Sequence, residues 1–308
     1  MLRLGVALLV TVLSFVTVLA QTAIPTREGR GGQAGQGGQG RRGGGPGPEI
    51  NLPATPVAAP LPTISAEITG PGPIFESLME LKPGDDMAHF KYEAHEYFVS
   101  GTANGQPYTT RIVIRRPADS SKFSGLVLAE SMHPSGNAWM FHFTHAYSMT
   151  TGHVGLDILT STSVPFAEFN SERYKSLQVG AGQAPEILAQ VGALMKSKQP
   201  ENPLAALHVR NMILAGTSAS AAALINYLPA HLVLRLSDMK PIFDGFLPTS
   251  TGATIRQIDV PMIQVPTMTE VMSGTATARQ DGDTPGDQFR VYEFPGMAHI
   301  DSRDAAAY

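Results

Sequence analysis

Two stretches near residue 100 alternate between apolar and polar side chains and are rich in β-branched and aromatic residues. They run from Tyr92 to Thr102 and from Thr109 to Arg115, with Gly105-Gln106-Pro107 between them. Alternation of this kind is typical of strands that bury one face, and a Gly/Pro segment between two such runs is typical of a turn. The pattern therefore predicts an antiparallel hairpin.

Further along the chain, the alternation gives way to short continuous apolar runs. These runs occupy residues 125–129, 154–159, 212–215, 242–247, 262–265 and 289–294. Segments with helical spacing or high alanine content, at 137–149, 185–198 and 219–228, lie between some of them. Apolar strands that alternate with helices indicate a parallel sheet buried on both faces. We therefore predict an α/β domain whose mixed sheet is mostly parallel after the hairpin, with helices on both faces.

The first twenty residues have the layout of a secretory signal peptide. Met1-Leu2-Arg3 is a short basic opening, Leu4 to Leu19 is almost wholly apolar, and Val18-Leu19-Ala20 carries small residues at alternate positions. This layout predicts export to the periplasm or the medium, with cleavage after Ala20. An uncleaved membrane anchor is the alternative, although the apolar run is slightly short for a span and contains polar hydroxyl residues.

A linker is predicted over residues 21–61, followed by one domain over residues 62–308. Eleven of the twenty residues from 29 to 48 are glycine, and prolines recur from Pro53 to Pro62. Such a segment has no apolar side chains to bury, so it favours a solvated tether over a folded module.

Composition excludes several functional classes. Hydrophobic residues make up 43% of the chain and charged residues 16%, which is a globular composition. Residues 49–308 carry 17 Lys and Arg against 25 Asp and Glu, so a nucleic-acid partner is disfavoured. The chain has no cysteine, which excludes disulfides, thiolate zinc sites, iron–sulfur clusters and cysteine nucleophiles.

The strongest local motif surrounds Ser218. An apolar strand runs into Gly216, and an alanine-rich helix follows Ser218, so the serine lies on a sharp strand-to-helix turn. This is the arrangement of a nucleophile elbow, in which the neighbours two residues away, here Gly216 and Ser220, must be small. The Ala219 N–H then lies at a helix N-terminus, where it can stabilise an oxyanion. The alternative is an ordinary turn in which Ser218 or Ser220 caps the helix.

A serine nucleophile needs a base, and the base needs an acid. His299 follows the last predicted strand in a Pro-Gly loop, and Glu270 lies in the loop after the strand at 262–265. The order Ser218, Glu270, His299 is the order of an α/β-hydrolase. The other candidates for the acid, Asp281, Asp283 and Asp287, lie in a Gly-rich stretch that is interpreted as a solvated loop.

These motifs together resemble exported bacterial proteins with the α/β-hydrolase fold. The matching pieces are Val127-Leu-Ala-Glu130, Asn170-Ser-Glu-Arg-Tyr174, the Ser218 turn, Thr267-Met-Thr-Glu270 and Pro295-Gly-Met-Ala-His299. The resemblance implies hydrolysis of a small-molecule carboxylic ester through an acyl-enzyme, with no metal or organic cofactor. It also implies that the second oxyanion donor is the N–H of Met132, next to His133.

Two features depart from the family pattern. Ser220 stands where the second glycine of the elbow is usual, and its side chain adds bulk against the sheet. The chain ends at Tyr308, nine residues after His299, whereas such folds normally close with a helix that backs the His loop. A truncated C-terminus is one interpretation of this ending.

Two other interpretations of function remain. His133, His142, His145 and His153 lie within 21 residues, and grouped imidazoles can bind zinc. Aromatic neighbours and the absence of a carboxylate at ligand spacing favour packed or surface histidines instead. The chain could also be a non-catalytic binding protein, or an inactive fragment, on the same scaffold, because a fold does not guarantee chemistry.

Overall fold

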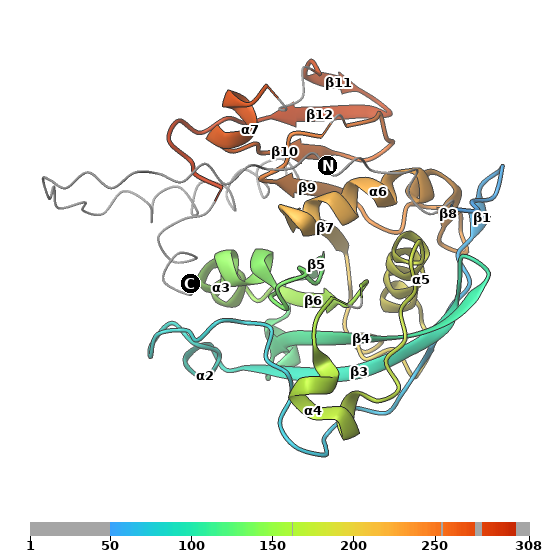
Figure 1. Cartoon of the computed structure of the whole chain (residues 1–308), viewed down its shortest axis with the longest axis vertical. Helices are drawn as coiled ribbons and strands as arrows, with labels where there is room; N and C mark the ends of the chain where they lie inside the picture. Colours follow the sequence, from blue (N-terminus) through green and yellow to red (C-terminus); the bar gives the residue numbers. More distant parts are fainter. Residues whose placement is uncertain (1–49, 162, 254, 275–278, 300–308) are drawn as a thin grey trace, which may run out of the picture. The chain divides into compact units, whose positions relative to one another are not determined.

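A ten-stranded mixed sheet forms the centre of the protein in a computed structural model (Figure 1). The structure describes residues 50–161, 163–253, 255–274 and 279–299. The strand order is β11-β12-β10-β9-β7-β5-β6-β4-β3-β2, and a separate two-stranded pair joins β1 to β8. The predicted signal segment, residues 1–20, and most of the predicted linker lie outside the described residues.

The strands are β1 (Val57–Ala58), β2 (Thr63–Ile64), β3 (Tyr92–Ala103), β4 (Gln106–Pro117), β5 (Leu126–Ser131), β6 (Val154–Ile158), β7 (Asn211–Thr217), β8 (Leu234–Arg235), β9 (Gly245–Thr249), β10 (Met262–Gln264), β11 (Gly282–Thr284) and β12 (Asp287–Val291). The helices are α2 (Met87–Phe90), α3 (Trp139–Thr151), α4 (Phe166–Tyr174), α5 (Ala184–Lys196), α6 (Ala219–Val233) and α7 (Met268–Met272), with a 3₁₀ turn at Ser120–Lys122.

The predicted hairpin is present as β3 and β4, which pair antiparallel along their whole length from Tyr92↔Pro117 to Ala103↔Gln106. Its turn consists of Asn104 and Gly105, both with positive φ (48° and 71°). Asn-Gly is the preferred pair for a two-residue turn that needs positive φ at both positions. The turn therefore lies one residue earlier than the segment that the sequence suggests.

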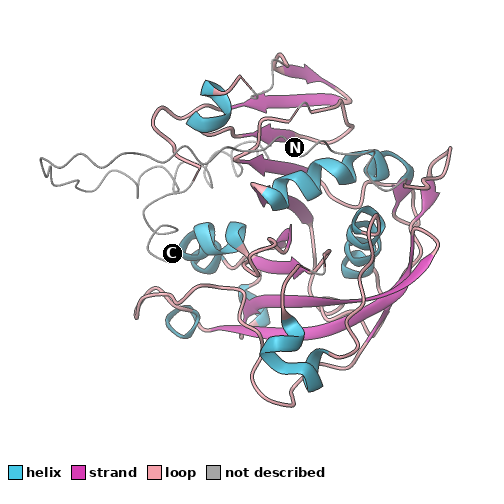
Figure 2. Cartoon of the chain, in the orientation of Figure 1, coloured by secondary structure: helices cyan, strands magenta, loops and turns pink. Residues whose placement is uncertain are grey.

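The centre of the sheet is parallel, as the continuous apolar runs predict. β6, β5, β7, β9, β10 and β12 pair parallel with one another in that order, and every residue of β5 and β6 is buried. The connections through α3 and α5 cross the sheet in opposite directions, so right-handed crossovers put these helices on opposite faces. The connection through α6, from β7 to β9, crosses the sheet in the same direction as the connection through α5. Helix α6 therefore lies on the same face as α5 and packs against it (Figure 2).

Part of the predicted linker belongs to the folded unit. β1 pairs with β8, and Ala59 lies in the main hydrophobic core. Ser65 and Ile68 then donate backbone hydrogen bonds to β3. The proline-rich lead-in is therefore laid against the domain from residue 50 onward. None of the helices in the described ranges is both long and apolar enough to cross a membrane.

Candidate active site

Ser218 lies on a sharp turn between β7 and α6, as the elbow pattern predicts. Its backbone has φ 53° and ψ −117°, a conformation that costs a non-glycine residue energy. The Ser218 N–H donates to the Thr249 carbonyl of the neighbouring strand. A Cβ added at Gly216 would lie 2.6 Å from the Ser220 backbone, so no larger residue fits there without moving the turn. The surrounding packing thus holds Ser218 in its strained conformation.

Ser220 closes the turn with its side chain. Its buried Oγ accepts a hydrogen bond from the Thr217 N–H at 2.9 Å and donates one to the Thr217 carbonyl at 2.8 Å. The departure from glycine therefore satisfies two buried backbone groups just before Ser218. The side chain thus packs on the backbone of Thr217, the last residue of β7.

The structure brings together the three residues that the sequence orders as nucleophile, acid and base. His299 Nε2 lies 2.9 Å from Ser218 Oγ, and His299 Nδ1 lies 2.8 Å from Glu270 Oε1. A carboxylate can only accept, so Nδ1 carries the proton and Nε2 accepts from the serine hydroxyl. Both His299 and Ser218 are partly exposed, so a substrate can reach the hydroxyl.

Glu270 lies on the one-turn helix α7 and not in a loop. Its second oxygen, Oε2, accepts hydrogen bonds from the N–H and the hydroxyl of Thr267, which leaves Oε1 for His299. Burial alone would favour the protonated acid, but the bonds from Thr267 and His299 outweigh it and hold the pKa of Glu270 below its usual value. Thr267-x-x-Glu270 is a capping-box pattern, which is the sequence signal for this helix.

The His299 loop is tied to α7 by backbone contacts. The Met268 N–H donates to the Met297 carbonyl, and the Met297 N–H donates to the Phe294 carbonyl across a Pro-Gly turn. The competing acids lie elsewhere, in the β11–β12 hairpin. Asp281 and Asp283 pair with Arg290, and Asp287 pairs with Arg279. Residues 281–287 are thus a structured hairpin and not the loop that the sequence suggests.

The two expected oxyanion donors, the N–H groups of Ala219 and Met132, differ in whether the protein already uses them for a hydrogen bond. Ala219 is the first residue of α6, and no hydrogen bond to its N–H is found among the described residues. The Met132 N–H donates to the Ile158 carbonyl at 2.7 Å, which extends the β5–β6 ladder by one step. The prediction that Met132 supplies a donor is therefore wrong in this conformation, because the amide is already used by the sheet.

Glu130 anchors the loop that follows β5. Its carboxyl accepts from the N–H groups of Met140 and Phe141 at the start of α3. Burial, reinforced by the adjacent Asp157 carboxylate, raises the pKa of Glu130 to about 8. The side chain is thus mostly a neutral acid near pH 7, and it fixes both ends of the loop at 131–138.

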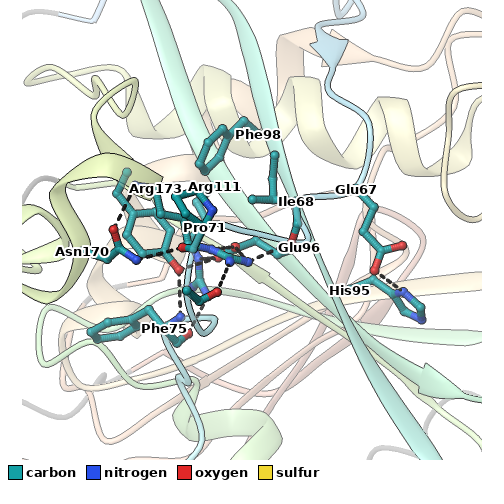
Figure 3. A network of polar contacts seen from close by, with 12 residues as sticks. Glu67, Ile68, Pro71, Phe75, His95, Glu96, Phe98, Arg111, Asn170 and Arg173 are labelled. Carbon is teal, nitrogen blue, oxygen red and sulfur yellow. Dashed lines mark hydrogen bonds and ion pairs between the residues drawn. The ribbon is translucent and has the colours of Figure 1, made fainter.

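The Asn170–Tyr174 motif belongs to a network of polar contacts that joins α4 to β3, β4 and the segment before β3 (Figure 3). Arg111 of β4 and Arg173 and Tyr174 of α4 all donate to the buried Glu96 carboxylate. Arg173 also donates to the Ile68 and Gly72 carbonyls, and the Asn170 amide donates to the Pro71 carbonyl. The motif thereby holds residues 68–75 in place.

Phe75, at the end of that segment, reaches the loop after β5. Its N–H donates to the Tyr174 hydroxyl, and its ring packs on Gly136, where an added Cβ would lie 3.0 Å from the ring. Met132 packs in the same small cluster as Tyr174 and Phe166. The sequence alone does not show what this motif does, because its partners lie 77 to 105 residues away in the chain.

Three of the four clustered histidines have separate polar partners, and the fourth, His142, packs its ring against the rings of Trp139 and His145. His145 contacts Asp85 at 3.0 Å, His153 contacts the Ser124 hydroxyl at 2.7 Å, and His133 contacts Ser135. In the described part of the chain, no group of three or more His, Asp or Glu side chains is arranged to hold a metal ion.

Comparison with known proteins identifies the family. No curated protein matches the chain. Similar solved structures include esterase Est22 (9% identity, 68% of this chain and 76% of that one, TM-score 0.40). They also include brefeldin A esterase, described as a bacterial homologue of human hormone sensitive lipase (10% identity, 70% of this chain and 72% of that one, TM-score 0.40). A third is a putative dienelactone hydrolase from Klebsiella pneumoniae (11% identity, 70% of this chain and 94% of that one, TM-score 0.40). At these values the likeness carries no argument about activity.

The sequence over residues 53–308, however, matches the family described as "Alpha/beta hydrolase domain", and the chain belongs to that family.

Proposed function

We propose that this protein is a serine hydrolase that cleaves carboxylic esters through an acyl-enzyme. The observation that carries the proposal is the continuous hydrogen-bond chain from Ser218 Oγ through His299 to Glu270, with contacts of 2.9 and 2.8 Å. An ordinary strand-to-helix turn would need none of these contacts. The family assignment supports hydrolysis as the reaction type.

In the proposed reaction, Ser218 Oγ attacks the ester carbonyl carbon while His299 Nε2 takes the hydroxyl proton. Glu270 holds the His299 ring in the correct tautomer and stabilises its positive charge. The Ala219 N–H, at the start of α6, donates to the oxygen that becomes negative in the tetrahedral intermediate. His299 then gives the proton to the leaving alcohol, which departs and leaves an acyl group on Ser218. Water, activated by the same ring, releases the acid.

The test uses fluorophosphonate labelling and hydrolysis of p-nitrophenyl acetate. Wild-type protein should label at Ser218, and Ser218→Ala should lose labelling and lose turnover by about 10⁴-fold or more, with an unchanged melting temperature. The exposed Ser176→Ala serves as the matched control and should behave as wild type. A wild-type protein that neither labels nor hydrolyses would favour the non-catalytic binding role. Labelling that persists in Ser218→Ala would move the nucleophile elsewhere.

Export is the second part of the proposal, and it is supported by the sequence pattern of residues 1–20. Cleavage after Ala20 would give a mature protein that begins at Gln21. Intact-mass measurement of protein recovered from the periplasm or medium of an exporting host checks this. Retention of residues 1–20 in the membrane fraction would support the anchor instead.

A further inference from the structure

The site as described holds one oxyanion donor, although two or more are usual for such sites. The Met132 N–H is used by the Ile158 carbonyl, and the next amide, that of His133, donates to the Asn137 carbonyl at 3.0 Å. The backbone at these two positions therefore offers nothing to a substrate. The His133 side chain lies on the same loop and is the next donor to consider.

The sheet register brings the His133 loop and Ser218 to the same edge of the sheet. In the parallel pair β5 and β7, Glu130 is opposite Ala215. His133 and Ser218 each lie three residues beyond these partners, at the same edge of the sheet. Consistent with this placement, burial and the nearby His299 ring together hold the pKa of the His133 imidazole below its ordinary value. The ring thus lies at the same edge of the sheet as the triad, in surroundings that favour its neutral form.

The loop also fixes which nitrogen of His133 carries the proton. The Ser135 N–H donates to His133 Nδ1 at 3.1 Å, so in the neutral ring Nδ1 is the acceptor and Nε2 carries the hydrogen. A tight turn holds the residue itself, since the Gly136 N–H donates to the His133 carbonyl at 2.8 Å. The Trp139 indole N–H donates to the Ser135 hydroxyl and braces the turn. The Nε2–H group is therefore held in one orientation before any substrate arrives.

We propose that the Nε2–H of His133 is the second oxyanion donor, acting with the Ala219 N–H on the carbonyl oxygen of the ester. The inference rests on the proposed ester hydrolysis at Ser218. It assigns His133 a hydrogen bond that strengthens as the oxygen becomes negative, with no proton transferred. A donor of this kind that is fixed in advance stabilises the transition state more than the bound ester, so its loss should lower kcat and leave KM nearly unchanged.

The test compares His133→Gln with His133→Met, two side chains of similar length of which only glutamine can donate. With p-nitrophenyl acetate, His133→Met should lose about 10²–10³-fold in kcat with KM within a few-fold of wild type. His133→Gln should recover most of that loss, to within about 10-fold of wild type. His208→Met is the matched control, because His208 is exposed and lies just ahead of β7, at the opposite edge of the sheet; it should be unaffected.

Three results would overturn the inference while leaving the proposed function intact. The first is a His133→Met variant within about three-fold of wild type while Ser218 still labels. The second is an equal loss in both variants together with a lower melting temperature, which would show a packing role. The third is the loss of one limb of the pH–rate profile in both variants, which would make His133 a proton carrier. A wild-type protein that does not label at Ser218 would overturn the proposed function and this inference together.

Discussion

Ser218 lies on a turn between the buried residues Gly216 and Ser220, whereas Glu270 lies on a one-turn helix after β10 and His299 on a loop after β12. Gly216 and Ser220 are fully packed around the serine turn. On the other side, a capping box and a single backbone bond between Met268 and Met297 do most of the positioning. We call Thr267 with helix α7, together with the loop at residues 292–299, the acid–base arm. The nucleophile is thus held by close packing, and the acid–base arm is held by a few hydrogen bonds.

This difference predicts how the two sides respond to change. A substitution that crowds the serine turn, such as one at Gly216, should disturb folding and activity together, because the same contacts serve both. Removing the charge of Glu270 in the acid–base arm should reduce activity with a small effect on folding. The variants below are ordered by the expected loss of turnover.

Glu270→Gln keeps the shape of the side chain and removes its charge. We expect turnover to fall by about 10³–10⁴-fold with a small change in melting temperature, because His299 loses its orienting carboxylate and counter-charge. Steady-state kinetics with p-nitrophenyl acetate measures this. Asp281→Asn and Asp283→Asn, in the β11–β12 hairpin, are controls and should stay within a few-fold of wild type. If Glu270→Gln stayed active while one of the controls lost its turnover, the aspartate changed in that control would be the acid.

Gly216→Ala tests the packed side of the comparison. The new methyl group would lie 2.6 Å from the Ser220 backbone, so the turn must shift. Overpacking of this kind costs about 1–3 kcal/mol in the free energy of unfolding, and we expect at least about 10²-fold lower turnover. Chemical denaturation and kinetics are measured together. Gly70→Ala, where an added Cβ meets nothing within 4 Å, is the matched control. Full activity in Gly216→Ala would mean that the turn is looser than its packing indicates.

Thr267→Val removes one hydrogen bond to Glu270, with exposed Thr269→Val as the control. We expect about 10-fold lower turnover and a loss of about 1.5–3 kcal/mol, the range for a bond to a charged group. The lowered pKa of Glu270 contributes stability that is present above its usual value of 4.5 and lost as pH falls through the lowered value. The gap in melting temperature between wild type and Thr267→Val should therefore be widest near pH 7 and close in acid. A gap that is constant with pH would contradict this assignment.

Ser220→Ala should have the smallest effect on turnover, within a few-fold. It leaves the Thr217 N–H buried without its partner, at a cost of about 1–3 kcal/mol. Denaturant unfolding measures the loss, and Ser176→Ala again provides the baseline. If Ser220→Ala unfolded as wild type does, the hydrogen bond to Thr217 would have no role in holding the turn.

The parts of the fold that could be predicted are those with a local signal. The alternating residues of β3 and β4 and the apolar runs of β5 to β7 can each bury their apolar side chains in only one way. The pattern alone therefore locates these strands. Ser218, Glu270 and His299 could be ordered because each follows an apolar strand, and parallel strands deliver such residues to one edge of the sheet.

Other features depend on contacts that no local pattern contains. Whether the Met132 amide is free depends on one further rung of the β5–β6 ladder, and the sequence at Ser131-Met132 does not show where a ladder stops. The helix that carries Glu270 has one turn and no periodicity to detect, although its capping box was visible. Arg173 could not be assigned a task because its partners, Glu96 and the carbonyls at 68 and 72, are distant in sequence.

The position of His299 on an extension beyond β12 also separates folding from catalysis. Among the described residues β12 is the last strand and ends at Val291, and the strands that pair around Ser218 all precede it. A single proteolytic cut between Val291 and His299 would leave the sheet, the serine turn and the Glu96 network in place while it removed the proton carrier. Such a nicked protein would still resemble the intact one by circular dichroism and melting, yet hydrolyse nothing. Exposed residues in this stretch, Glu293, Pro295 and Gly296, make it a place where a protease could end activity without first unfolding the domain.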